Sequence, residues 1–271
     1  MAARIRPAEF YFPDPYPSAW ASNWGEDQYG LWVALCDHEV RQVFRWIAAG
    51  RFLMGSLADE AGRDADETQH EVTLTRGYWL ADTACTQALW RLVMGENPSR
   101  FSEDLRNPVE QVSWEEVDEF IKRLNRLVPG LEACLPTEAQ WEYACRAGTT
   151  TPFSFGENVT PAQVNYDGNY PYARGAKGLY REQTVPVGTL PPNPWGLYEM
   201  HGNVWEWCAN WYGDCAEGSQ IDPAGPDQGA SRVLRGGSWS FVAGYARSAF
   251  RFGPGYRDGD VGFRLALGQE E

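Results

Sequence analysis

The chain has 271 residues and is rich in aromatic side chains, with 13 Trp, 13 Tyr and 12 Phe, and in glycine, with 28 residues. This length is enough for one large hydrophobic core, and the mixture is typical of a fold with much irregular backbone in which large rings supply buried area. The 37 acidic and 23 basic side chains give a net charge of −14, which argues against nucleic acid and anionic lipid as partners.

No apolar run reaches the length of a membrane span, and the N-terminus lacks the basic-then-apolar pattern of a signal peptide. We therefore expect a cytoplasmic protein, with display at the cell surface by another route as the open alternative. The sequence does not define the oligomeric state, for which a monomer is favoured. The cysteines are scattered without a CxxC pair, so reduced and mostly buried thiols are expected at Cys36, Cys85, Cys134, Cys145, Cys208 and Cys215.

Residues 1–50 precede the part of the chain with the clearest motifs. We expect 1–30 to form an extended arm without periodic structure, packed on the core through Trp20 and Trp24, because disordered tails are usually poor in aromatics. The stretch VRQVFRWI, between Leu31 and Ala49, predicts a strand that ends at the turn Ala49-Gly50. The main domain is then expected to run from 51 to 271.

The middle of the chain predicts a mixture of strands and helices. The stretch 57–69 carries five carboxylates and is expected to be a solvated loop, with metal binding as the less favoured alternative. HEVTLTRGYWL, from 70 to 80, alternates like a half-buried strand. Thr86 is placed to cap a helix that runs towards Met94, and the capping boxes of 113–116 and 137–140 predict two more helices. These elements indicate the α+β class.

The closing segment, residues 232–267, alternates two kinds of position. Scaffold-like positions are Arg235-Gly236-Gly237-Ser238-Trp239, Ala246-Arg247-Ser248-Ala249, Arg251, Pro254, Arg257 and Gly262-Phe263-Arg264. Between them lie fourteen residues without a helical or strand period, called the interleaved positions below: Ser240, Phe241, Val242, Gly244, Tyr245, Phe250, Phe252, Gly253, Gly255, Tyr256, Asp258, Gly259, Asp260 and Val261.

Four strings, PVEQVSWEEV, LPTEAQWEYACRAGT, GLYEMHGNVWEWCANW and RVLRGGSW, occur in the order found in the formylglycine-generating-enzyme (sulfatase-modifying factor) family. The chain resembles that family from about Arg51 to Leu267, which implies a C-type lectin-like α+β fold with much irregular structure. Enzymes of the family hold copper with two cysteines, whose positions here are about Phe241 and Ala246. A soft metal needs thiolates there, so we expect neither copper nor formylglycine generation.

The interleaved positions resemble the variable positions of diversity-generating retroelement proteins. In that system a template repeat rich in Asn codons is copied with errors only at adenines, so that Lys, Glu, Gln, Met and Trp cannot arise. All fourteen interleaved residues obey this restriction. The resemblance implies a non-enzymatic ligand-binding protein, hypervariable within about 232–267, whose ligand is an unidentified protein or surface glycan.

The interleaved positions hold five aromatics beside several glycines, a composition typical of antibody paratopes. If these side chains point outward, they form an apolar patch rimmed by Asp258 and Asp260, which would mark a binding site. The alternative is that they point inward as core. We favour the outward arrangement, because the segment already has core residues of its own in Trp239, Val233, Phe263 and Leu265.

A second family resemblance concerns calcium. The segment 203–206 resembles a calcium-binding loop of the family, in which oxygens of Asn203, Val204 and Glu206 would suit Ca²⁺. The alternative is a structural turn in which Asn203 caps a backbone group and Glu206 pairs with an arginine.

Neighbouring aromatic and histidine residues are interpreted as structural. Trp205, Trp207 and Trp211 are expected in the core rather than in a sugar-stacking platform, and His201 is expected to be structural rather than catalytic. Two other functions stay open: an oxidase that has moved its active residues, for instance to Cys208 or Cys215, and an accessory domain without a hypervariable role.

Overall fold

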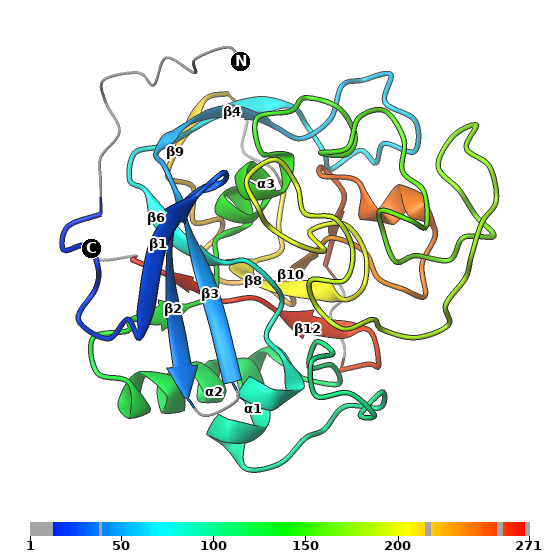
Figure 1. The fold of residues 1–271 in the computed structure, drawn as a ribbon. Coiled ribbons are helices and arrows are strands. Elements are labelled where there is room, and N and C mark those ends of the chain that lie inside the picture. Colours follow the sequence, from blue (N-terminus) through cyan, green and yellow to red (C-terminus); the bar gives the residue numbers. More distant parts are fainter. Residues whose placement is uncertain (1–12, 38–39, 215–217, 254–256, 269–271) are drawn as a thin grey trace.

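A six-stranded antiparallel sheet joins both ends of the chain in the computed structural model, which describes residues 13–37, 40–214, 218–253 and 257–268 (Figure 1). Its strand order is β1 (Asn23–Asp27), β2 (Gly30–Asp37), β3 (Val40–Ile47), β6 (Tyr78–Ala81), β13 (Ala266–Leu267) and β7 (Ala133–Cys134). Because β3 precedes Gly50 and pairs with β6 after it, one sheet continues across the boundary expected at Gly50.

The N-terminal region is more regular than its sequence suggests. The VRQVFRWI stretch forms β3 as predicted, but β1, inside the 1–30 region expected to be an irregular arm, is a strand that forms a hairpin with β2. Trp20 packs on the core as expected, with its ring 5.9 Å from that of Phe44. Trp24 does not, because it lies on the edge strand β1 and its side chain is 49% exposed.

All three predicted helices are present and begin at the predicted caps. They are α1 (Gln87–Met94), α2 (Trp114–Leu127) and α3 (Glu138–Arg146). Thr86 caps α1, and both capping boxes are complete. Helices α1 and α2 share one hydrophobic cluster, in which Trp90 stacks on Phe120 at 5.1 Å and Phe263 packs edge-on against both rings.

Two smaller sheets complete the described fold. One has the order β4 (Gly50–Met54), β5 (His70–Leu74) and β9 (Gln220–Ile221), so the single strand expected over 70–80 is in fact two strands of different sheets. The other has the order β11 (Arg251–Phe252), β10 (Arg232–Arg235), β8 (Trp205–Trp211) and β12 (Val261–Phe263). Short strands, three helices within the described residues and long irregular connections confirm the α+β class.

The closing segment passes through several of these elements in turn. It forms β10, a short 3-10 helix η1 (Ala243–Ala246), β11, β12 and β13, so its strands belong to two of the three sheets. In the part of the chain that the structure describes, no helix has both the length and the apolar character needed to cross a bilayer.

Candidate ligand-binding face

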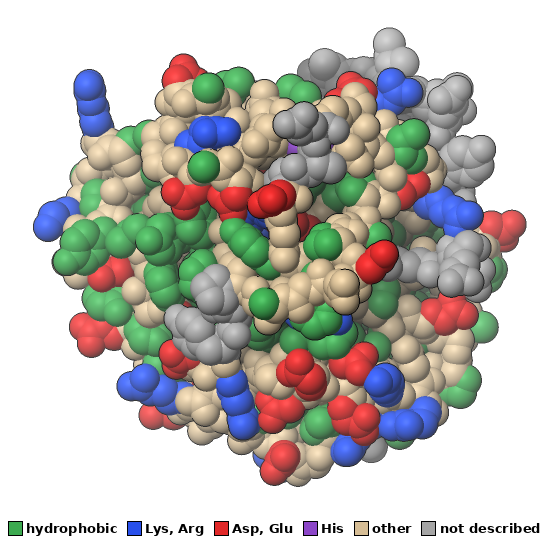
Figure 2. All heavy atoms as spheres, turned by 180° about the vertical axis from the view of Figure 1, so that it is seen from behind, with side chains coloured by type: hydrophobic (Ala, Val, Ile, Leu, Met, Phe, Trp, Pro, Cys, Tyr) green, Lys and Arg blue, Asp and Glu red, His purple; other side chains and the backbone are tan. Residues whose placement is uncertain are grey.

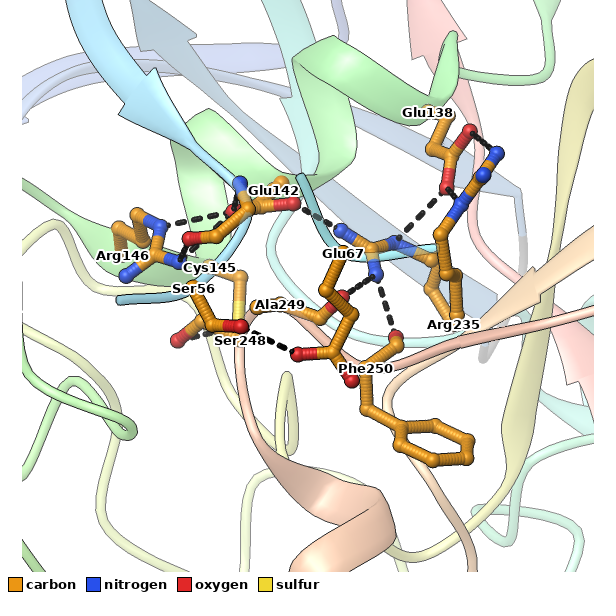
Figure 3. A network of polar contacts seen from close by, with 12 residues as sticks. Ser56, Glu67, Glu138, Glu142, Cys145, Arg146, Arg235, Ser248, Ala249 and Phe250 are labelled. Carbon is orange, nitrogen blue, oxygen red and sulfur yellow. Dashed lines mark hydrogen bonds and ion pairs between the residues drawn. The ribbon is translucent and has the colours of Figure 1, made fainter. Parts of the chain in front are cut away.

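Buried arginines hold the closing segment on helix α3 (Figure 3). Arg235 of β10 pairs with Glu142 and donates to the carbonyl oxygens of Ala249, at 2.8 Å, and Phe250. Arg251 of β11 makes a two-pronged pair with Glu138, at 2.8 and 2.7 Å. A buried charge needs a partner, so both glutamates of α3 fix the path of the chain on either side of η1.

Arg247 anchors the segment at the end of η1. Its guanidinium is fully buried and contacts Glu67 at 2.6 and 2.7 Å, Glu60 at 2.6 Å and the carbonyl oxygen of Gly62 at 2.6 Å. Burial raises the pKa of Glu67, but the hydrogen bonds and charge of Arg247 outweigh it and hold the pKa below its usual value. The stretch 57–69 is a mostly exposed loop as predicted, except that the side chains of Glu60 and Glu67 are buried partners of Arg247.

The backbone of the closing segment also packs closely against itself at Gly237. Its backbone has φ +70°, and a Cβ atom added there would lie 2.9 Å from the backbone of Tyr245 and Ala246. Only glycine fits this combination of left-handed backbone and close contact. The RGGSW string thus brings β10 directly against η1.

The scaffold-like and interleaved positions differ in burial. The described scaffold positions are buried, except the exposed Arg257. Most of the interleaved side chains that reach solvent are half-buried, whereas Tyr245 and Asp258 are exposed. We call this set the display face: Ser240, Phe241, Val242, Gly244, Tyr245, Phe252 and Asp258.

The aromatic members of the display face gather over Trp205 of β8. The ring of Trp205 is buried, and ring centroids lie 5.5 Å from it at Phe241, 5.4 Å at Phe252 and 6.4 Å at Tyr245. Tyr245 also stacks on Phe250 at 4.5 Å. The result is a layered aromatic cluster whose lower layer belongs to the core and whose upper layer is partly open to solvent.

Not every interleaved residue faces outward as expected. Phe250 is only 5% exposed, since it forms the layer beneath Tyr245. Asp260 is buried as well, because its Oδ2 accepts hydrogen bonds from the hydroxyls of Ser238 and Ser240, and burial raises its pKa. Gly253, Gly259 and Val261 are also buried, and Gly255 and Tyr256 lie outside the described residues.

A loop that sequence reasoning did not connect with this site lies beside it. The amide of Asp167 donates to the carbonyl oxygen of Phe241 at 2.9 Å, and the amide of Ala243 donates to that of Tyr170 at 3.1 Å. The ring of Tyr180 stacks on that of Trp239 at 6.3 Å. These contacts join residues about 60 to 75 positions apart, and no local sequence pattern signals them.

The calcium hypothesis for 203–206 does not fit the contacts of its side chains. The carboxylate of Glu206 binds Arg264 at 2.6 and 2.8 Å and accepts from the indole of Trp141 at 2.7 Å. The side-chain oxygen of Asn203 accepts from the Asn165 amide group and from the amide of Val185. Because donors already occupy these two side-chain oxygens, Asn203 and Glu206 match the structural turn that was the alternative from sequence, whereas a calcium site that also uses the Val204 carbonyl oxygen stays a prediction.

His201 is held in a neutral form by its neighbours. Its Nδ1 must carry the proton, because it lies 2.7 Å from the carbonyl oxygen of Ala246, which only accepts. Its Nε2 must be bare, because the amide of Ser154 donates to it at 3.1 Å. Burial lowers the pKa of His201 to about 4. This fits the structural role expected for it.

The positions that matter for the oxidase alternative are apolar or buried. Phe241 and Ala246, which replace the copper-binding cysteines, offer no ligand atom in their side chains. Cys208 is fully buried, and burial raises the pKa of its thiol well above the usual value, while Cys215 lies outside the described residues. Trp205 and Trp207 are core as expected, and Trp211 is half-buried.

Comparison with known proteins confirms the resemblance to the sulfatase-modifying factor family. The model of the sulfatase-modifying factor enzyme 1-like domain matches residues 36–268, a range that begins before Gly50. The formylglycine-generating enzyme of Streptomyces coelicolor is 37% identical over 172 residues, which make up 59% of this chain and 52% of that protein. The chain thus matches about half the length of this relative.

Solved structures share the fold over nearly their whole length. Treponema denticola variable protein 1 superposes with a TM-score of 0.74 and 28% identity, over 87% of this chain and 98% of that one. PvdO from Pseudomonas aeruginosa superposes with a TM-score of 0.69 and 26% identity, over 91% and 98%. The fold is therefore the C-type lectin-like fold of the formylglycine-generating-enzyme type, and the chain belongs to the family of sulfatase-modifying factor enzyme 1-like domains.

Proposed function

We propose that the chain is a non-enzymatic ligand-binding protein that presents variable residues on a C-type lectin-like scaffold. One observation carries this proposal: the described scaffold positions of the closing segment, which follow the family pattern, are buried except Arg257, whereas seven of the twelve described interleaved positions reach solvent. A family likeness to a protein named as variable, Treponema denticola variable protein 1, supports it.

The scaffold supplies what such a function requires. Arg235, Arg247 and Arg251 anchor the segment through carboxylates outside it, so these ion pairs involve no side chain of the display face. Replacing an exposed side chain then changes the surface while the ion pairs that position the backbone remain. A rigid support that holds adaptable side chains is the arrangement by which paratopes work.

The chemistry of the display face favours a protein ligand. Its members Phe241, Val242, Tyr245 and Phe252 offer aromatic and aliphatic area without a buried charge, the composition of an interface centre. A surface glycan is the alternative ligand. Structural Ca²⁺ has no part in this proposal, because the side-chain oxygens of Asn203 and Glu206 are engaged elsewhere.

The decisive test is on DNA. The few kilobases that flank the gene are sequenced and searched for a near-copy of codons 232–267. We expect a copy that differs from the gene only at adenines, at the fourteen interleaved positions, with a reverse transcriptase gene nearby. If no repeat is present and close relatives carry the same residues at 240–261, the chain is an accessory domain of the family and the proposal is wrong.

A further inference from the structure

The loop beside the display face, residues 168–181, is called the rim loop here. It projects at the right-hand edge of Figure 1, next to η1. The hydrogen bonds from Asp167 to Phe241 and from Ala243 to Tyr170 join the loop to the closing segment on both sides of Val242. The loop therefore borders the display face at Phe241 and Val242, where a ligand on that face can also reach it.

The rim loop is held in place by its own contacts. The amide of Gly178 donates to the carbonyl oxygen of Gly168 at 2.8 Å, and a Cβ atom at Gly168 would lie 2.3 Å from the carbonyl oxygen of Leu179. Tyr172 is buried against Phe153, and its hydroxyl donates to the carbonyl oxygen of Ala61 at 2.8 Å. The loop is thus a fixed surface, and none of its residues is an interleaved position.

The rim loop presents apolar and basic groups to solvent. Tyr170 is 58% exposed and Leu179 is 59% exposed. Arg174 and Lys177 are exposed and have no ion-pair partner among the described residues. In Figure 2, which views the molecule from behind, this edge lies at the left, where basic side chains project beside hydrophobic ones.

The rim loop is basic, whereas the chain as a whole is acidic. The segment 168–181 contains three basic residues and no acidic one, although the chain as a whole has a net charge of −14 and only two lysines. Asp167 and the exposed Glu182 flank the loop near Tyr180, so the charged side chains between them are all basic. An acidic ligand repelled by most of this protein would therefore be attracted at one edge of the display face.

We infer that the rim loop is a constant part of the ligand-binding surface, and that it selects a protein partner with an acidic patch beside an apolar one. This inference rests on the proposed function, because it needs the display face to be the binding site. The display face would supply apolar contact that varies, whereas Arg174 and Lys177 would supply a charge preference that does not.

The test uses a random dodecapeptide library displayed on phage and three variants of the full chain. The rim variant is Arg174→Glu with Lys177→Glu. The control, Lys122→Glu with Arg126→Glu, makes the same change of charge at exposed positions of α2. Tyr245→Ala tests the display face itself.

We expect wild type and the control to enrich peptides that combine Asp or Glu with aromatic residues, and the rim variant to lose this acidic preference. A selected peptide should bind the rim variant about tenfold more weakly than the control. Its binding to wild type and to the control should weaken as the salt concentration is raised. If all three proteins select the same peptides, or if wild type selects none that are acidic, the inference is overturned.

The fourth protein separates this inference from the proposed function. If Tyr245→Ala weakens binding while the rim variant does not, the display face binds ligand and the role of the rim loop is refuted. If the rim variant weakens binding while Tyr245→Ala does not, the loop binds acidic peptides by itself, and a composite surface is refuted together with the role of the display face.

Discussion

Replacing Glu67 by Gln tests whether a buried ion pair positions the display face. Glu67 is 1% exposed, and its carboxylate contacts the Arg247 guanidinium at 2.6 and 2.7 Å. Removing one partner of such a pair typically costs about 3–5 kcal/mol, because a charge is left buried without compensation. Glu60 remains as a second partner of Arg247, so we expect the lower end, about 3 kcal/mol.

The measurement is urea unfolding followed by tryptophan fluorescence, with equal m values for wild type and variant. Glu119→Gln is the matched control, because Glu119 pairs with Arg123 at 2.7 Å on the exposed face of α2 and should contribute under about 1 kcal/mol. Because the pKa of Glu67 lies below its usual value, its contribution is present at neutral pH and is lost as pH falls through the folded-state pKa. If Glu67→Gln loses no more stability than Glu119→Gln, the ion pair of Glu67 with Arg247 does not hold the segment in place.

Two further predictions concern the display face and His201. Tyr245→Ala should change stability by under about 1 kcal/mol and weaken ligand binding by about 2 kcal/mol. Phe250→Ala, at the buried ring beneath Tyr245, should cost about 3–5 kcal/mol of stability. Equal unfolding midpoints for the two variants would contradict this arrangement of an outer and a buried ring. The His201 imidazole should titrate near pH 4 in the folded protein, against about 6.5 when unfolded. Between these values the unfolded chain binds more protons, so stability should fall by about 1.4 kcal/mol per unit as pH drops, and NMR titration of His201 near pH 6.5 would refute its buried, neutral state.

Local elements followed from local residues. The N-cap residues Thr86, Ser113 and Thr137 predicted three helices, because an N-cap side chain and the backbone N–H group it binds lie within one helical turn. Strand β3 was also predicted from its own residues, VRQVFRWI. The hairpin of β1 and β2 was not, since its pairing depends on a partner sheet that the aromatic and proline-rich stretch does not reveal.

The closing segment shows how much of the site can be predicted from residue types together with the family pattern. Its scaffold positions could be separated from the interleaved ones, and most of the former are buried. The depth of each interleaved side chain could not be predicted, however. Phe250 and Phe252 have the same chemistry and lie two positions apart, yet Phe250 is buried beneath Tyr245 of η1, whereas Phe252 stacks on Trp205 of β8 and stays partly open to solvent.

The sequence by itself determined the family, the α+β class, the three helices and the two kinds of position in the closing segment. The tertiary structure alone decided which carboxylates are solvated and which are buried. Glu67 lies 180 residues from Arg247, and no periodic pattern in the sequence predicts their pairing. It also decided that the rim loop borders the display face. The physical reason is the same in both cases, since the contacts that place a charge or a loop are made between segments distant in the chain, whereas caps and alternation act within a few residues.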